Sequence, residues 1–231
     1  MARRATGSNQ YRTRAGSNSL DVSGGPDLMA HARRGLAGSS YRMKIRVSLM
    51  SYDRKLRAAR DTNISQLLAQ LARDPDMRVR RRVAQNPNTP GPVLEKLAST
   101  RDDELGYVVA QNPNTPPGAL VQLSRDPDER VRRGVAQNPN TPPETLVQLA
   151  GDGDEGVRRW VTQHPNTPPH VLRRLAEDED GVVRRGVAQH PNTTPHVLAQ
   201  LAGDNNEFVR RLALLNPNLP EEYRVLGRVE R

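Results

Sequence analysis

The chain has 231 residues, of which 35% are hydrophobic and 3% aromatic, and it contains no cysteine. This composition excludes disulfides, zinc–thiolate sites and cysteine-held iron–sulfur clusters, and no apolar run reaches the ~18–20 residues of a membrane-spanning helix. The net charge of +9 is uneven, because residues 1–60 hold 13 of the 35 basic residues but only three of the 26 acidic ones. The rest of the chain is nearly neutral, which argues against a uniformly basic nucleic-acid-binding surface. The lack of cysteine and of a membrane-spanning run predicts a cytoplasmic protein.

Residues 1–40 are rich in Gly, Ser, Ala and Arg without hydrophobic periodicity, which predicts a disordered basic tail. No apolar segment follows Arg3 and Arg4, so we expect no signal peptide. The sequence leaves open whether this tail is a solvated extension or a functional basic arm. Apolar content rises from Tyr41, and residues 41–62 are predicted to be an N-terminal capping segment.

Residues 63–218 are predicted to form six modules of 26 residues each. The string Val83-Ala84-Gln85-Asn86-Pro87-Asn88-Thr89-Pro90 returns from Val109, Val135, Val161 and Val187, and in altered form from Ala213. Residues 219–231 keep a helix start at Pro220 but lose the leucine register, as expected of a C-terminal cap.

The first half of each module carries two leucines three residues apart, followed by a small residue, which predicts one face of a helix. The pairs are Leu68/Leu71, Leu94/Leu97, Leu120/Leu123, Leu146/Leu149, Leu172/Leu175 and Leu198/Leu201. In Thr141-Pro142-Pro143-Glu144 we expect an N-cap hydroxyl, a proline in the first turn and a capping-box glutamate.

The second half of each module predicts another helix, short enough to be partly 3₁₀. It opens on residues that can cap a helix start, namely Asp76, Asp102, Asp128, Asp154, Asp180 and Asn206. Its apolar residues are four apart: Val79/Val83, Leu105/Val109, Val131/Val135, Val157/Val161, Val183/Val187 and Val209/Ala213. An Asn-Pro or His-Pro step ends it, because a residue before proline is pushed out of the α region.

A single module buries too few side chains to offset the ordering of its backbone, so the modules are expected to stack as a solenoid. The run Val131-Arg132-Arg133-Gly134-Val135-Ala136-Gln137-Asn138-Pro139-Asn140-Thr141-Pro142-Pro143 resembles the leucine-rich repeat variant family. That resemblance implies an all-α, right-handed solenoid of alternating α and short 3₁₀-type helices, similar to HEAT and armadillo arrays. Some members of the family carry a cysteine-ligated iron–sulfur module, which this cysteine-free chain lacks.

The strongest candidate site is a ladder of arginines in the second helices. Two neighbouring positions are arginine in five of the six modules, at Arg80/Arg81, Arg132/Arg133, Arg158/Arg159, Arg184/Arg185 and Arg210/Arg211. Both point away from the first core valine, so the ladder is predicted either to bind acidic groups of a partner or to pair with the parallel row Asp76, Asp128, Asp154 and Asp180.

Trp160 has glycine at the same position in both neighbouring modules, Gly134 and Gly186. Two hypotheses stay open for it: the indole fills the space that the glycines leave, or it is an anchor on a binding surface.

Four of the five histidines fall in two copies of one pattern, His164/His170 and His190/His196. Metal ligation by these side chains is one hypothesis and duplication of a module is the simpler one, so we predict no metal and no cofactor. The asparagines before proline, Asn86, Asn112, Asn138 and Asn216, are assigned to turns.

These observations predict a non-enzymatic scaffold that binds a macromolecule along its concave, second-helix face, with Trp160 and the arginine ladder in contact. The placement on that face rests on analogy with HEAT-like arrays. A protein partner is our first choice. The alternative is a nucleic acid held by the basic tail and the arginines, and a HEAT-like enzyme acting on DNA or a pigment is a third class.

Overall fold

The computed structural model describes residues 47–100 and 103–223. The chain divides into two compact units, residues 1–50 and 51–231. In the first unit the described part contains one 3₁₀ helix, η1 (Val47–Leu49). Throughout the described ranges the chain is all-helical and contains no strand.

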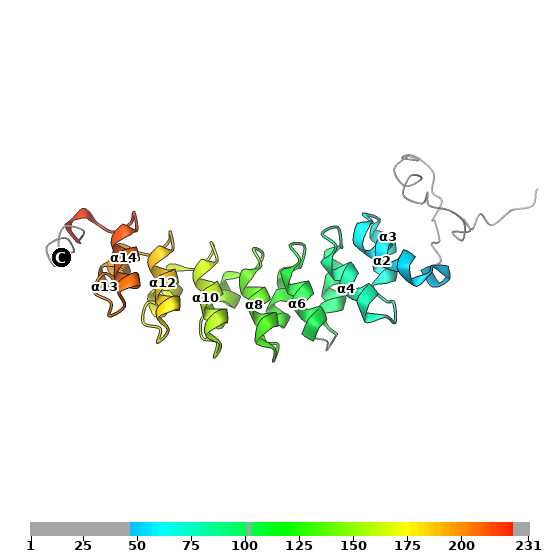
Figure 1. Ribbon diagram of the computed structural model, residues 1–231, viewed down its shortest axis with the longest axis horizontal. Coiled ribbons are helices and arrows are strands. Elements are labelled where there is room, and N and C mark those ends of the chain that lie inside the picture. Colours follow the sequence, from blue (N-terminus) through cyan, green and yellow to red (C-terminus); the bar gives the residue numbers. More distant parts are fainter. Residues whose placement is uncertain (1–46, 101–102, 224–231) are drawn as a thin grey trace, which may run out of the picture. The chain divides into compact units, whose positions relative to one another are not determined.

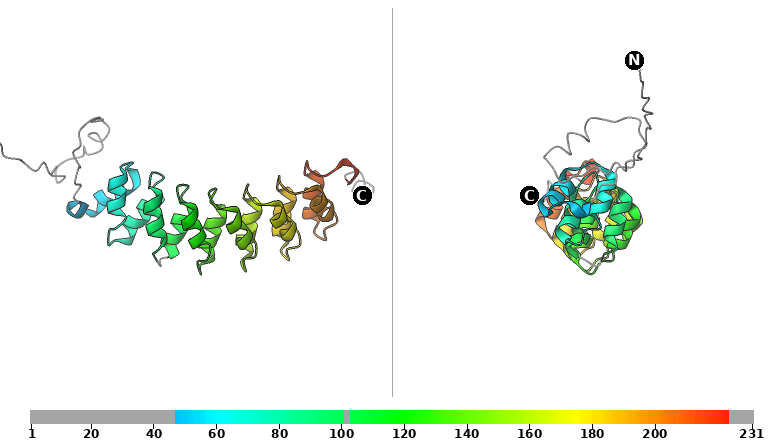
Figure 2. Two further views of the ribbon diagram at one scale, coloured as in Figure 1. Left: turned by 180° about the vertical axis from the view of Figure 1, so that it is seen from behind. Right: turned by 90° about the vertical axis from the view of Figure 1, so that its right-hand side faces the viewer.

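In the second unit, α2 (Tyr52–Asp61) is followed by six pairs of short helices, one pair in each module. The first helices are α3 (Ser65–Leu71), α5 (Gly91–Ala98), α7 (Pro117–Leu123), α9 (Pro143–Leu149), α11 (Pro169–Leu175) and α13 (Pro195–Leu201). The second helices are α4 (Met77–Gln85), α6 (Asp103–Gln111), α8 (Glu129–Gln137), α10 (Glu155–Gln163), α12 (Gly181–Gln189) and α14 (Glu207–Leu215). Each second helix packs on the second helix of the next module, and the modules follow one another in chain order (Figures 1 and 2).

The core consists of the leucines and valines that the periodicity singled out. All six leucine pairs of the first helices are buried, and the paired apolar residues of the second helices are fully buried. The predicted helix faces are therefore confirmed. An additional buried position precedes each leucine pair and had not been predicted, at Leu67, Val93, Ala119, Thr145, Val171 and Val197.

Acidic or amide caps start the second helices as predicted. The carboxylate of Asp128 accepts a hydrogen bond from the backbone N–H of Arg130 at 2.8 Å, and Asp180 accepts one from Val182 at 2.6 Å. Asp76, Asp154 and Asn206 cap their helices in the same way, whereas Asp102 lies outside the described residues.

The predicted threonine cap of the first helices is wrong. The N-cap of α9 is Pro142, and its helix start has no side-chain hydrogen bond. The hydroxyl of Thr141 instead donates to the carbonyl of Val135 in the preceding second helix. Thr89, Thr115, Thr167 and Thr193 do the same, so this buried hydroxyl satisfies a carbonyl that the end of a helix leaves free.

The second helices are α-helices of nine residues, which corrects the expectation that they are partly 3₁₀. Their ends lie where the proline rule predicts. Asn138 at the end of α8 has extended backbone angles, φ −73° and ψ 124°, and His164 and His190 end α10 and α12 in the same conformation.

The asparagines before proline form turns, as assigned, and they also join the modules. In Asn138, Oδ1 accepts the N–H of Asn140 at 2.9 Å, while Nδ2 donates to the carbonyls of Ala110 and Asn112 in the preceding module at 2.6 and 2.9 Å. The same amide bonds recur at Asn86, Asn112 and Asn216. This buried ladder fixes each module to the one before it.

The structure describes only part of the terminal segments that were predicted from the sequence. The tail of residues 1–40 lies outside the described residues, and so does the C-terminal cap beyond Tyr223. Within residues 41–62, α2 lies one period before α4 and packs against it.

Candidate functional site

The two arginine columns of the ladder differ in position and in binding partners, although they are adjacent in sequence. The first column, Arg80, Arg132, Arg158, Arg184 and Arg210, runs along the interfaces between modules. Arg132 forms a bidentate ion pair with Asp152 of the next module, through Nε at 2.7 Å and Nη2 at 2.9 Å. Its Nη1 donates to the carbonyls of Asp126 and Pro127 at 2.8 and 2.9 Å. One guanidinium therefore holds the turn of its own module and the acid of the next one.

The same clamp, an arginine paired with the acid 20 residues ahead, recurs at Arg158–Asp178 and Arg184–Asp204 with Nε–Oδ2 distances of 2.7 Å. Arg158 is 8% exposed, so its charge is largely withdrawn from solvent. Arg184 holds the pKa of Asp204 below its usual range, chiefly by hydrogen bonding. Arg80 and Arg210 make the two carbonyl bonds without an ion pair to any described acid.

The acids of the clamp are not the row that the sequence singled out. Asp152, Asp178 and Asp204 lie two residues before the helix caps, whereas the predicted row consists of the caps themselves. Of that row, only Asp154 pairs with an arginine of a neighbouring module, Arg133, at 2.6 Å. Asp76 and Asp128 pair with arginines of their own helices, Arg78 and Arg130.

The second column, Arg81, Arg133, Arg159, Arg185 and Arg211, lies on the outward side of the helices. Arg81 forms an exposed ion pair with Glu104 at 3.0 Å. Arg133 lies over Gly156, where a Cβ would come within 2.6 Å of its Nε. Arg159, Arg185 and Arg211 have no ion pair with any residue that the structure describes. The cations left open to a ligand therefore belong mainly to this column.

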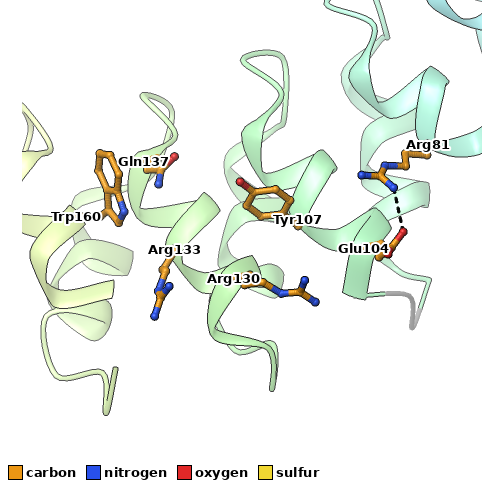
Figure 3. A pocket seen from close by; sticks show the side chains of 7 residues that line it. All are labelled: Arg81, Glu104, Tyr107, Arg130, Arg133, Gln137 and Trp160. Carbon is orange, nitrogen blue, oxygen red and sulfur yellow. Dashed lines mark hydrogen bonds and ion pairs between the residues drawn. The ribbon is translucent and has the colours of Figure 1, made fainter. Parts of the chain in front are cut away.

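A shallow cleft of about 380 Å³ opens over α4, α6, α8 and α10 (Figure 3). Arginines and two aromatic rings line it together: Arg81, Glu104, Tyr107, Arg130, Arg133, Gln137 and Trp160. Tyr107 replaces arginine in the second column, and its hydroxyl accepts a hydrogen bond from Gln111 at 2.8 Å. The cleft thus joins apolar ring surface to guanidinium groups.

Trp160 is half-buried at the edge of this cleft (Figure 3). The space beside the neighbouring glycines belongs to other side chains. A Cβ at Gly134 would meet the Cβ of Ala110 at 3.0 Å, and a Cβ at Gly186 would overlap the hydroxyl of Thr162. The nearest side chains at these two glycines are therefore those of Ala110, Tyr107 and Thr162, and part of the Trp160 ring is exposed at the edge of the cleft.

Three positions in each second helix form one outward-facing surface, which we call the outer stripe. They lie two, five and nine residues after the N-cap and share one face of the helix. The stripe consists of Arg78, Arg81, Gln85; Glu104, Tyr107, Gln111; Arg130, Arg133, Gln137; Gly156, Arg159, Gln163; Val182, Arg185, Gln189; and Phe208, Arg211, Leu215. It holds seven arginines and one glutamate. Arg78, Arg81, Arg130 and Arg133 are ion-paired with acids, whereas Arg159, Arg185 and Arg211 have no ion pair with any described residue and make the stripe basic toward its C-terminal end.

The two predicted histidine pairs are split between the interior and the surface. His164 and His190 take the place of the ladder asparagines and are 3% exposed, whereas His170 and His196 are exposed. Nε2 of His164 lies 2.9 Å from the carbonyl of Asn138, and its Nδ1 accepts the N–H of Asn166 at 3.2 Å. Burial lowers the pKa of His164 and His190. In the described part of the chain, no three His, Cys, Asp or Glu residues are grouped to hold a metal ion.

The sequence contained periodic signals for the clamp acids and the outer-stripe glutamines, which were not predicted. The acids of the clamp recur with the 26-residue period, as do the glutamines of the outer stripe at positions 85, 111, 137, 163 and 189. Their roles depend on how one module is rotated against the next, which the helical pattern of a single module does not specify.

No helix in the described ranges has the length and hydropathy needed to cross a bilayer. The family model described as leucine rich repeat variant matches residues 77–104, 109–128, 129–154 and 155–180. No curated protein matches the chain significantly.

A solved structure described as "a leucine-rich repeat variant with a novel repetitive protein structural motif" is 28% identical, with a TM-score of 0.58, over 78% of this chain and 77% of that one. The crystal structure of an engineered protein is 18% identical, over 78% of this chain and 94% of the other, and its TM-score of 0.35 supports no conclusion. The resemblance seen in the sequence is thereby confirmed: leucine-rich repeat variant modules are identified within residues 77–180, and the structural match supports the same all-helical repeat fold.

Proposed function

We propose that this protein is a non-enzymatic scaffold that binds an acidic segment of a protein partner along the outer stripe. The observation that carries the proposal is the separation of charge within the repeat array. Three arginines of the stripe, Arg159, Arg185 and Arg211, have no ion pair with any described residue, although residues 61–231 as a whole are nearly neutral. Charge concentrated on one surface attracts ligands of opposite charge and orients them there.

The contact residues proposed are Arg159, Arg185 and Arg211, which have no ion pair with any described residue, together with Tyr107 and Trp160. The first arginine column is left out, because its members in the middle of the array already hold Asp152, Asp178 and Asp204. Replacing Arg132, Arg158 or Arg184 would break a largely buried ion pair and lower stability, so loss of binding in such variants would not identify a contact.

The test compares two pairs of arginines in the full-length chain. Arg159→Gln/Arg185→Gln removes two charges from the outer stripe, and Arg125→Gln/Arg173→Gln removes two exposed charges away from it. Fluorescence anisotropy would measure the Kd of a labelled, flexible Glu/Ser/Gly peptide at about 0.15 M salt, where the Debye length is about 8 Å. We expect the stripe variant to bind roughly 5–30-fold more weakly, since each of the two exposed charge contacts contributes about 0.5–1 kcal/mol.

The matched control should keep the affinity of the unchanged protein within a factor of about two, because its two charges lie off the stripe. Equal losses in both variants would show that only overall charge matters and would refute the proposal. A single-stranded oligonucleotide is the competing probe. Tighter binding of that probe, with a steep salt dependence that the stripe variant reduces, would assign the surface to nucleic acid instead.

A further inference from the structure

The outer stripe has a regular composition, with an arginine and a glutamine four residues apart in most modules. This pair is Arg81/Gln85, Arg133/Gln137, Arg159/Gln163 and Arg185/Gln189. Residues four apart lie on the same side of a helix, so the arginine and the glutamine of each pair belong to one face. A ligand lying along the stripe meets an arginine and a glutamine at each of these four modules.

The spacing of these pairs selects the conformation of a bound chain. Packed helices lie about 8–10 Å apart, and the second helices of adjacent modules pack directly on one another. In a β-strand, residues on the same side recur every ~6.6–6.8 Å, which is too short for this spacing. In a polyproline II helix, residues on the same side recur every three residues, or about 9.3 Å, which matches it.

The glutamines favour a peptide over a phosphate backbone. An amide side chain offers both donors and an acceptor, and a polyproline II segment makes no internal hydrogen bonds, so its backbone groups are free to pair. A phosphate offers acceptors only, and the amide oxygen would find no partner there. Gln163 and Gln189 are exposed, and neither is hydrogen-bonded to another described side chain.

The aromatic residues of the cleft support the same ligand. Aromatic side chains form the grooves in which proline-rich segments dock. Tyr107 stands at the arginine position of the second module, and Trp160 lies two modules further along. Figure 3 shows Gln137 between the two rings, whereas the guanidinium of Arg133 points away from them. The tail of this chain is excluded as the occupant, because residues 1–60 are themselves strongly basic.

We infer that the partner segment is an acidic, proline-containing peptide in the polyproline II conformation, with a carboxylate at every third residue in register with the modules. This inference rests on the proposed function and specifies its ligand. Arg159 and Arg185, which have no ion pair with any described residue, pair with the carboxylates, the glutamines hold the backbone, and the aromatic rings of the cleft contact prolines.

The experiment uses the full-length chain and two labelled peptides of identical composition and charge. The in-register peptide is five consecutive Glu-Pro-Pro triplets, so that its glutamates match the modules. The out-of-register peptide is five consecutive Glu-Pro pairs followed by a run of five prolines, so that its glutamates recur every second residue. Because both peptides carry equal charge, binding to the basic tail would not separate them. We expect the in-register peptide to bind at least fivefold more tightly, as measured by fluorescence anisotropy.

Three variants test whether the preference for the in-register peptide depends on the outer stripe. Arg159→Gln/Arg185→Gln should abolish it, whereas the control Arg125→Gln/Arg173→Gln should retain it. Gln163→Leu/Gln189→Leu should weaken binding of the in-register peptide at least threefold, because the backbone contacts are lost.

The outcomes separate this inference from the proposed function. Equal binding of the two peptides, both weakened in the Arg159/Arg185 variant, would overturn the register while leaving an acidic partner on the stripe. If the Arg159→Gln/Arg185→Gln variant still prefers the in-register peptide, the inference is overturned as well, because the peptide must then bind outside the outer stripe. If neither peptide but only the oligonucleotide binds through these arginines, both proposals fail.

Discussion

At the scale of single residues, histidine takes the place of asparagine in the buried ladder of two modules. Asn138 donates two hydrogen bonds to the preceding module, whereas His164 and His190 each place Nε2 against one carbonyl. In both histidines Nδ1 accepts a backbone N–H two residues ahead. This pattern requires a neutral ring with its proton on Nε2.

Protonation of these rings should therefore weaken the fold. Burial holds the pKa of both below the unfolded value of about 6.5, so the unfolded chain binds more protons and stability falls as the pH drops below that value. A proton on Nδ1 would also face the N–H that it now accepts. We expect a loss of roughly 1–3 kcal/mol between pH 7 and pH 5, the cost of leaving buried polar groups unpaired.

Urea denaturation of His164→Asn/His190→Asn at both pH values checks this, because asparagine restores the usual ladder and does not titrate. The double variant should lose much less stability than the unchanged chain over that range. His170→Asn/His196→Asn, which alters the exposed members of the same sequence pattern, is the control and should behave like the unchanged chain. If the two double variants respond alike to pH, the buried rings are not the cause.

At the scale of elements, the arginine clamp between second helices is interrupted at α6. Gly106 occupies its arginine position, so Asp126 of the next module has no arginine of the clamp opposite it. Thr100, 20 residues after Arg80, stands where the clamp has an aspartate in the other modules. A Cβ at Gly106 would lie 3.4 Å from Val131, which is an ordinary contact. The backbone there can accept a side chain.

Gly106→Arg should complete the clamp and stabilise the array. Replacing glycine within a helix contributes about 1 kcal/mol, and an ion pair with Asp126 adds up to about 1 kcal/mol. A higher midpoint of urea unfolding is the measurement. Gly106→Ala isolates the helix effect, so a midpoint no higher for arginine than for alanine would show that no ion pair forms.

The elements themselves were largely predictable, because each depends on residues close in sequence. The leucine and valine spacing predicted the buried faces of all six modules, and the aspartates and prolines predicted where the second helices start and end. Contacts across modules were not predictable in this way. The pairing of Arg132 with Asp152 and the bond of Thr141 to Val135 depend on the rotation between helices, and both were assigned differently from the sequence.

The candidate site shows the same division. The sequence identified arginines and Trp160, but it treated the two arginine columns as one surface. Only the packing of the second helices separates Arg158, which is buried against Asp178, from Arg159, which is exposed one residue later. A rotation of 100° per residue turns neighbouring side chains to different surroundings.

At the scale of the repeat unit, the interactions that hold the modules together reach only the adjacent module. The asparagine and histidine ladder spans 24 to 28 residues and the arginine clamp spans 20. Stability in such an array is approximately a sum of module and interface contributions. Removal of a complete module should therefore leave every type of interface intact.

Deletion of residues 155–180 tests this directly. It joins Asp154 to Gly181, so Asp154 is placed to cap α12 as Asp180 does now, and Arg184 reaches the turn carbonyl of Asp152 in place of that of Asp178. Gly186 would face Ala136 instead of Thr162. We expect the same circular dichroism per residue at 222 nm, cooperative unfolding, and a modestly lower midpoint of urea unfolding.

Deletion of residues 155–167 removes α10 but keeps α11, which leaves a first helix without its partner and should abolish cooperative unfolding. If the complete-module deletion unfolds as the half-module deletion does, stability depends on contacts beyond nearest neighbours.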